Sequence, residues 1–174
     1  ITVLALAKKQ GYICYALSFD YGQRHNAELI AAAKIASDYQ VEEHKIIKLG
    51  LGSIGGSALT DKLIAVPDTL QAGIPVTYVP ARNTIFLSFA VSCAEAIGAK
   101  AIFIGANAVD FSGYPDCRPG YYKVYNELIA RGTKAGAAIK IHTPLINMAK
   151  SGIIRLGKKL GVPYEHTWSC YTGG

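Results

Sequence analysis

The sequence lacks the features that mark membrane, secreted and disordered proteins. Among its 174 residues no apolar run approaches the roughly 20 residues that a membrane-spanning helix needs. The opening ITVLALAKK is too short and too early for a secretory signal, and no small-residue cleavage site follows it. Charged residues make up only 17% of the chain and hydrophobic residues 51%, a balance that excludes a disordered protein. We therefore expect a globular, cytoplasmic protein.

Cysteine is scarce as well. The four cysteines are scattered, without a CxxC pair or the dense spacing of a disulfide framework: Cys14, Cys93, Cys117 and Cys170. This usage favours a reducing compartment. Because a structural zinc site needs roughly four ligands, the residues alone do not predict zinc at Cys170.

Long runs of one charge are also absent, although the formal net charge is +6. The lysines and arginines are spread over many segments, and no run of five or more basic residues occurs. Dispersed positive charge leaves three interpretations open, which are a solvated surface, a phosphate-rich small ligand and a polynucleotide. The solvated surface is favoured and the polynucleotide is the weakest of the three.

Helical and strand patterns alternate along the chain, which predicts an α/β fold with a parallel sheet and helices on both of its faces. Apolar spacing and stop signals indicate helices at 1–10, 26–39, 82–97, 120–131 and 151–160. Short runs rich in β-formers indicate strands at 12–19, 44–49, 101–105 and 139–142. The length is that of one domain of roughly 100–200 residues, so we expect residues 1–174 to form a single domain.

Polar loops after these strands carry most of the chemistry. Right-handed crossovers place such loops at one edge of a parallel sheet, where ligands bind. The stretch SFDYGQRH (18–25) is either a ligand-binding loop or a plain strand-to-helix turn with a solvated basic end. Residues 50–79 contain seven glycines and prolines and little periodicity, which is typical of a functional or mobile stretch.

A second polar segment, YVPARNT (78–84), delivers Arg82 and Asn83 to the start of a buried helix. Backbone N–H groups at a helix start attract anions, and an adjacent arginine strengthens that attraction. Asn83 or Thr84 could instead be an ordinary N-cap. The two roles are compatible, and we favour a ligand-binding one.

The third segment, GANAVDFSGYPDCRP (105–119), is the most distinctive. We expect it to be a polar loop, and it holds two carboxylates, an arginine, an amide and two aromatic side chains. Aromatic faces stack on a flat heterocycle, and a carboxylate can accept two N–H bonds from a guanine-like edge. Lys134 and Lys150 lie beside further loops, where a lysine suits a phosphate as a point charge, although single lysines are mostly surface residues.

Together these segments resemble the 7-cyano-7-deazaguanine synthase family, within the N-type ATP pyrophosphatases. The similarity rests on SFDYGQRH, YVPARNTIFLS, NAVDFSGYPDCRP, IHTPL and TWSCY, in that order, and covers nearly the whole chain. It implies a three-layer adenine nucleotide alpha hydrolase-like (HUP or Rossmann-like) fold with a small C-terminal zinc-binding segment. It also implies an ATP-dependent carbon–nitrogen ligase of queuosine biosynthesis, which converts 7-carboxy-7-deazaguanine and ammonia to the nitrile through adenylated carboxylate and amide intermediates.

The resemblance assigns roles to the matched residues. Arg82 and Lys134, with Mg²⁺, would stabilise the charge at the α-phosphorus of ATP. The residues that would contact the deazaguanine substrate are Asp110, Tyr114, Asp116 and Arg118. Those that would contact ATP or the substrate carboxylate are Ser18, Asp20, Tyr21, Gln23, Arg24 and Asn83. Family members tend to be homodimers and act on a free base, so no stable nucleic-acid partner is expected.

Two parts of the family pattern do not occur in the printed sequence. The phosphate loop, an SGGxDS stretch, would precede Ile1, and three further cysteines in CxxCxxC spacing would follow Gly174. The resemblance thus implies that Cys170 is the first of four ligands to a structural zinc ion, and that both sites are incomplete here.

Two rival interpretations remain open. One is another adenylating enzyme, such as a tRNA thiolase or an amidotransferase synthetase domain, which would require a catalytic cysteine pair or a glutaminase partner. The other is a non-catalytic nucleotide- or RNA-binding module. The first leaves the segment NAVDFSGYPDCRP unexplained, and a steep salt dependence of RNA binding would mark the second.

Overall fold

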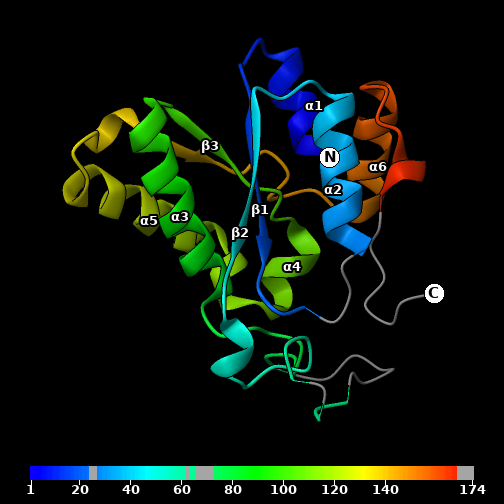
Figure 1. The fold of residues 1–174 in the computed structure, drawn as a ribbon, viewed down its shortest axis with the longest axis vertical. Helices are drawn as coiled ribbons and strands as arrows, with labels where there is room; N and C mark the ends of the chain where they lie inside the picture. The colour runs from blue at the N-terminus through cyan, green and yellow to red at the C-terminus, as the bar shows by residue number, and fades with distance from the viewer. Residues whose placement is uncertain (24–26, 62, 66–72, 168–174) are drawn as a thin grey trace. The chain divides into compact units, whose positions relative to one another are not determined.

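The computed structural model describes residues 1–23, 27–61, 63–65 and 73–167, with the backbone alone at 110–112 (Figure 1). The chain divides into two compact units, of which the first consists of Ile1, Val3–Pro80 and Gly157–Gly174. The second consists of Thr2 and Ala81–Leu156. Each unit holds one pair of parallel strands, which confirms the α/β class with parallel pairing. That the whole chain is a single domain stays a prediction.

The first unit is built around strands β1 (Tyr15–Asp20) and β2 (Glu43–Lys48). Helix α1 (Thr2–Lys9) precedes them, and helix α2 (Ala27–Asp38) connects them and packs against β1 (Figure 1). The strands pair in register, with Ala16 opposite His44 and Asp20 opposite Lys48. All four elements were predicted from the sequence to within three residues at each end, because apolar spacing, β-forming residues and stop signals are local features of the sequence.

The described part of the glycine-rich stretch 50–79 consists mainly of turns, in which buried residues lie beside exposed ones such as Leu63 and Ile74. It contains a short 3₁₀ helix, η1 (Leu51–Ser53), and a turn whose residues Ser57, Ala58 and Leu59 are buried. The Ala58 N–H donates to the carbonyl of Val76 at 2.8 Å. Backbone hydrogen bonds within and across the turn therefore replace the regular pairing that the sequence lacks.

The second unit contains helix α3 (Arg82–Ile97), strand β3 (Ala101–Phe103), helix α5 (Pro119–Gly132) and strand β4 (Lys140–His142). Between β3 and α5 lie helix α4 (Ala108–Gly113) and the 3₁₀ helix η2 (Pro115–Cys117). The sequence predicts a polar loop there, and this is wrong: six residues of helix are too few to show a period. A 3₁₀ turn, η3 (Gly136–Ala138), precedes β4, and helix α6 (Lys150–Lys159) and the 3₁₀ helix η4 (Tyr164–His166) follow it.

The core of the second unit forms where α3 and α5 meet the pair β3–β4. Leu87 and Ile129 are 2% and 0% exposed. The other buried members are Val91, Ala94, Ile102, Ala106, Cys117, Tyr122, Tyr125, Ile139 and Ile141. Helix α3 was predicted to be buried, and it buries one face, with Leu87, Val91 and Ala94, while Phe89 and Ile97 are exposed.

The side of β4 that faces away from β3 is occupied by one amide side chain. In this parallel pair, Lys140 and His142 make the backbone hydrogen bonds toward β3. The N–H and C=O of Ile141 point the other way. There the Asn126 side chain accepts from the Ile141 N–H at 2.8 Å and donates to its C=O at 3.3 Å. An α5 side chain therefore satisfies both backbone groups.

Helix α6 contains a glycine, Gly157, at a position where a larger residue has no room. A Cβ added at Gly157 would overlap the ring of Tyr164, with the ring Cζ only 2.6 Å away. Gly157 is buried. The aromatic ring thus lies directly on the helix backbone, which only a residue without a side chain permits.

Candidate nucleotide and substrate site

Ser18 lies near the carboxyl end of β1 and bonds to a neighbour on β2. Its hydroxyl is 2.9 Å from Nε2 of His44. The two side chains share a face of the pair, because His44 is opposite Ala16 and residues two apart on a strand point the same way. Both are half-buried. An imidazole nitrogen donates or accepts according to its tautomer, so His44 directs the hydroxyl hydrogen of Ser18.

The turn after β1 is shaped by Gln23. Its Oε1 accepts from the Tyr21 N–H at 2.8 Å, and its Nε2 donates to the carbonyl of Phe19 at 3.3 Å. Gly22 adopts φ +86°, a conformation that disfavours other residues. Tyr21 is buried, and the carbonyl of Asp20 accepts from the Leu49 N–H at 2.7 Å. The amide predicted to meet the nucleotide therefore holds the turn, and it orders the region in which Asp20 and Tyr21 lie.

Helix α3 begins from a strained residue. Ala81 takes the N-cap position with φ +53° and ψ +22°, which is uncommon for a residue other than glycine. The guanidinium of Arg82 lies 5.9 Å from the centroid of the Phe86 ring, within the range of a cation–π contact. The segment YVPARNT follows turns at 73–80 rather than a strand, so only two of the three predicted segments directly follow strands.

Asn83 and Asp116 contact each other although they lie 33 residues apart in sequence. The Asn83 N–H donates to Oδ2 of Asp116 at 3.1 Å. In return, Nδ2 of Asn83 donates to the backbone oxygen of Asp116 at 3.3 Å and to Sγ of Cys117 at 3.2 Å. Both residues are buried, at 7% and 6% exposure. The structure thus brings together two of the predicted site residues.

The rest of the third segment is more open. Tyr114 is half-buried and takes the N-cap position of η2, and its carbonyl accepts from the Cys117 N–H at 3.1 Å. Arg118 is exposed at the N-cap of α5. Asp110 lies within α4, and its side chain is outside the description. Among the candidates of this segment whose side chains the structure describes, Tyr114 and Arg118 are the accessible ones.

Lys134 is exposed on a loop that is anchored on both sides. The Ala135 N–H donates to Oε1 of Glu95, on α3, at 2.8 Å. The Thr133 hydroxyl donates to the carbonyl of Ile129 at 2.9 Å. These two contacts hold the backbone that carries Lys134.

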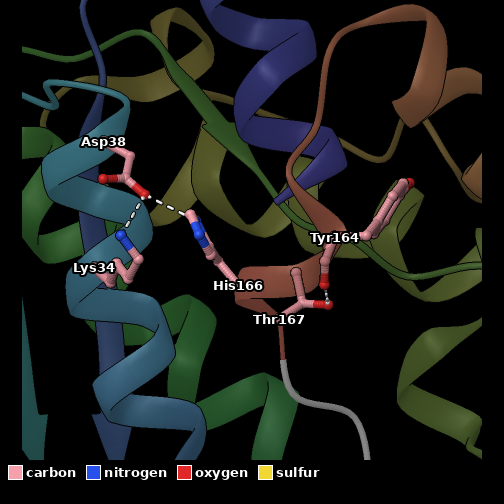
Figure 2. Close-up of polar contacts among 5 residues, drawn as sticks. All are labelled: Lys34, Asp38, Tyr164, His166 and Thr167. Atoms are coloured by element: carbon pink, nitrogen blue, oxygen red, sulfur yellow. Dashed lines mark hydrogen bonds and ion pairs between the residues drawn. The ribbon is translucent and has the colours of Figure 1, made fainter.

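The end of the described chain is attached to α2 by a hydrogen bond (Figure 2). Nδ1 of His166 lies 3.2 Å from Oδ2 of Asp38, and Nζ of Lys34 lies 3.3 Å from the same oxygen. Asp38 is the last residue of α2, where the helix dipole disfavours a carboxylate and these two side chains offset it. Arg24 and Cys170 lie outside the described residues.

Within the described ranges, no group of three or more His, Cys, Asp or Glu side chains lies close enough to hold a metal ion. In the part of the chain that the structure describes, no helix has the length and apolar character needed to cross a bilayer.

Sequence reasoning did not single out His44 and Glu95, which bond to the predicted site residue Ser18 and to the loop that carries Lys134. His44 lies in the predicted strand 44–49 and Glu95 in the predicted helix 82–97, where polar side chains normally face solvent. Register arguments could have placed His44 beside Ser18 once the two strands were paired. No local signal could have matched Glu95 to a loop 40 residues later.

Comparison with known proteins identifies the family. The family model described as Queuosine biosynthesis protein QueC matches residues 1–174. The chain belongs to this family. A curated relative from Methylococcus capsulatus, named 7-cyano-7-deazaguanine synthase, is 57% identical over 173 residues, covering 98% of this chain and 78% of the relative. Relatives with the same name from Pseudomonas syringae pv. syringae and Thiobacillus denitrificans are 57% and 56% identical, over 98% of this chain and 76% and 77% of theirs.

A solved structure shares the fold. The U34-tRNA thiolase NcsA from Methanococcus maripaludis, with its 4Fe-4S cluster, matches with a TM-score of 0.52 and 15% sequence identity. The match covers 97% of this chain and 57% of the thiolase chain. It confirms the predicted fold class and carries nothing about activity. Membership of the QueC family, over the whole chain, decides against the thiolase interpretation and confirms the predicted part in queuosine biosynthesis.

Proposed function

We propose that the chain catalyses the ATP-dependent conversion of 7-carboxy-7-deazaguanine and ammonia to 7-cyano-7-deazaguanine. The observation that carries this proposal is the family match over residues 1–174, together with relatives of that name at 56–57% identity. A carboxylate does not react with ammonia unless its oxygen is made a leaving group. ATP supplies that activation by forming an acyl adenylate and pyrophosphate, and ammonia displaces AMP to give the amide. A second ATP adenylates the amide oxygen, which leaves as AMP with loss of the two N–H protons to give the nitrile.

The residues of the first unit are proposed to serve the nucleotide. Ser18 and Asp20 offer a hydroxyl and a carboxylate near the carboxyl end of β1, and parallel strands present ligand-binding groups at that end. This donor set suits the hydroxyl and amino groups of a nucleoside. Tyr21, Gln23 and Arg24 complete the proposed set, with Gln23 holding the turn through its two backbone bonds.

The residues of the second unit are proposed to serve the phosphate and the deazaguanine. Arg82 and Lys134 would stabilise negative charge that develops at the α-phosphorus. Asp110, Tyr114 and Arg118 would contact the substrate, Tyr114 by stacking and Arg118 through the carboxylate. Asp116 is left out of this set because its carboxylate is bonded to Asn83 inside the protein.

Magnesium, zinc, a cytoplasmic location and a homodimer belong to the proposal as well. Magnesium would neutralise the phosphates of ATP, and zinc would bind Cys170 together with further cysteines. Ammonia is the proposed nitrogen donor.

The test is turnover by the intact protein that contains this chain. With 7-carboxy-7-deazaguanine, ammonium and Mg-ATP, we expect pyrophosphate release and a nitrile product by mass spectrometry. Arg82→Ala and Lys134→Ala should each lower kcat about 100-fold, as loss of a charge that faces a transition state does. Lys123→Ala, at an exposed position on α5, is the matched control. Absence of nitrile from the wild-type protein would refute the proposal.

A further inference from the structure

Helix α3 begins without a cap of its own. Its N-cap residue, Ala81, makes no side-chain hydrogen bond to the first turn. The first N–H groups of any helix lack partners within the helix, and alanine is among the poorest residues at this position. The sequence of the helix start therefore leaves donors that another part of the chain must satisfy.

Asp116 satisfies one of these donors from η2. Its Oδ2 accepts from the Asn83 N–H at 3.1 Å, which is the contact that a capping side chain makes to the second helical residue. A carboxylate also complements the positive end of the helix dipole, and a hydrogen bond to a charged acceptor is stronger than one to a neutral acceptor. At 6% exposure this bond is shielded from water.

The contact is reciprocal and continues along the helix. The Asn83 amide returns a hydrogen bond to the Asp116 backbone at 3.3 Å. Further along α3, the hydroxyl of Thr84 lies 2.9 Å from that of Tyr121, and Ser88 lies 2.9 Å from Tyr125. Arg82 directly precedes Asn83, so these contacts fix the backbone from which the arginine side chain extends.

We propose that Asp116 is a positioning residue, which acts through α3 on Arg82 and does not read the guanine-like edge of the substrate. The proposal rests on the proposed function, in which Arg82 stabilises charge at the α-phosphorus. A carboxylate that reads a guanine-like edge turns both oxygens toward the N–H groups of the ligand. One oxygen of Asp116 is already bonded to Asn83, and the residue is buried.

Two substitutions in the intact protein separate the two roles. Asp116→Asn keeps an oxygen that can cap the helix, because asparagine caps about as well as aspartate. If Asp116 instead read the guanine-like edge of the substrate, this substitution would place the new NH₂ group, a hydrogen-bond donor, against the N–H donors of the substrate. Asp116→Ala removes both roles. Glu127→Gln, at an exposed position on α5, makes the same carboxylate-to-amide change away from the helix start.

If Asp116 is a positioning residue, its substitution should change kcat and leave KM for the substrate nearly unchanged. Asp116→Ala should lower kcat about 10- to 100-fold, as loss of a hydrogen bond to a charged group does, with KM for 7-carboxy-7-deazaguanine within about threefold of wild type. Asp116→Asn should restore kcat to within about fivefold of wild type. A rise in that KM of about tenfold or more in Asp116→Asn would overturn the proposal in favour of direct readout.

Amide exchange gives a readout that does not need turnover. The Asn83 amide should exchange faster in Asp116→Ala and stay protected in Asp116→Asn, and equal protection in all three proteins would overturn the proposal. If Asp116→Ala does not fold, KM and amide protection in Asp116→Asn decide alone. A wild-type protein that makes no nitrile would refute the proposed function and leave the exchange result standing.

Discussion

The imidazole of His44 and the hydroxyl of Ser18 form a hydrogen bond of 2.9 Å between neighbouring parallel strands. Such a bond couples two side chains that are 26 residues apart in sequence. If Ser18 contacts the nucleotide, His44 sets the direction in which the hydroxyl donates, and the two residues act as a unit.

Substitution of either residue should weaken ATP binding to a similar degree. Ser18→Ala and His44→Ala should each raise KM for ATP about three- to tenfold, the effect of one neutral hydrogen bond. The double variant should be little worse than either single variant, because both remove the same interaction. Steady-state kinetics at varied ATP measures this. Strictly additive effects would contradict the coupling, and Lys45→Ala, at an exposed position on β2, is the control.

Ala81 should behave unlike an ordinary alanine. Because its φ is +53°, Ala81→Gly should leave the free energy of unfolding unchanged or raise it by up to about 1 kcal/mol. Ala81→Val should lower it by about 1–2 kcal/mol, since a β-branched residue resists this conformation. Urea denaturation measures both. The control is Ala130→Gly, inside α5, which should lower the free energy of unfolding by about 1 kcal/mol. The same loss in Ala81→Gly would show that Ala81 does not adopt the left-handed conformation.

Glu95 should support catalysis through the loop of Lys134. Glu95→Ala removes the acceptor for the Ala135 N–H, so kcat should fall about three- to tenfold with KM for both substrates nearly unchanged. Glu95→Gln keeps an acceptor oxygen and should recover most of that loss. A fall in kcat of the same size for both variants would show that the charge, rather than the hydrogen bond, matters.

Gly157 should tolerate no larger residue while Tyr164 is present. A Cβ would overlap the ring of Tyr164, so Gly157→Ala should lower the free energy of unfolding by about 1–3 kcal/mol. Thermal unfolding of Gly157→Ala, Tyr164→Ala and the double variant forms a cycle. We expect the double variant to be more stable than the sum of the single losses predicts, and simple additivity would exclude the overlap.

Cys14 should be a slow thiol. Burial raises its pKa and the nearby Lys8 partly opposes this, so at a given pH less of the reactive thiolate is present than in an unfolded chain. At pH 8 we expect alkylation of Cys14 by iodoacetamide to be slower in the native protein than in urea, and slower still in native Lys8→Met. Faster labelling in Lys8→Met would show that Lys8 does not lower the pKa of Cys14.

The same shift links Cys14 to stability. Because the pKa of Cys14 is higher in the folded than in the unfolded protein, the contribution of this thiol to stability is lost as the pH rises through the folded pKa.

The parts of the fold that the sequence predicted are those with strong local patterns. Helix α3 was predicted at 82–97 and is observed at Arg82–Ile97, because buried positions recur every three or four residues until Gly98 ends the helix with φ +71°. The strands β3 and β4 were predicted to within two residues at each end from short apolar runs.

The parts that escaped prediction depend on contacts distant in sequence. The carboxylate of Asp116 caps a helix that begins 34 positions earlier, and nothing around Asp116 indicates this. The segment 105–119 was recognised as special, yet its composition suggested contact with a ligand and could not reveal the contact with Asn83. The buried turn at Ser57 depends likewise on a backbone bond to Val76.

The amide of Asn126 has a consequence for the behaviour of the protein at high concentration. Unpaired N–H and C=O groups on a strand edge are a template on which another chain can add a strand and begin to aggregate. At Ile141 both groups are already bonded to Asn126, so the outer side of β4 offers no continuous ladder to an incoming strand. A single polar side chain from α5 thereby protects a short strand against intermolecular β-pairing.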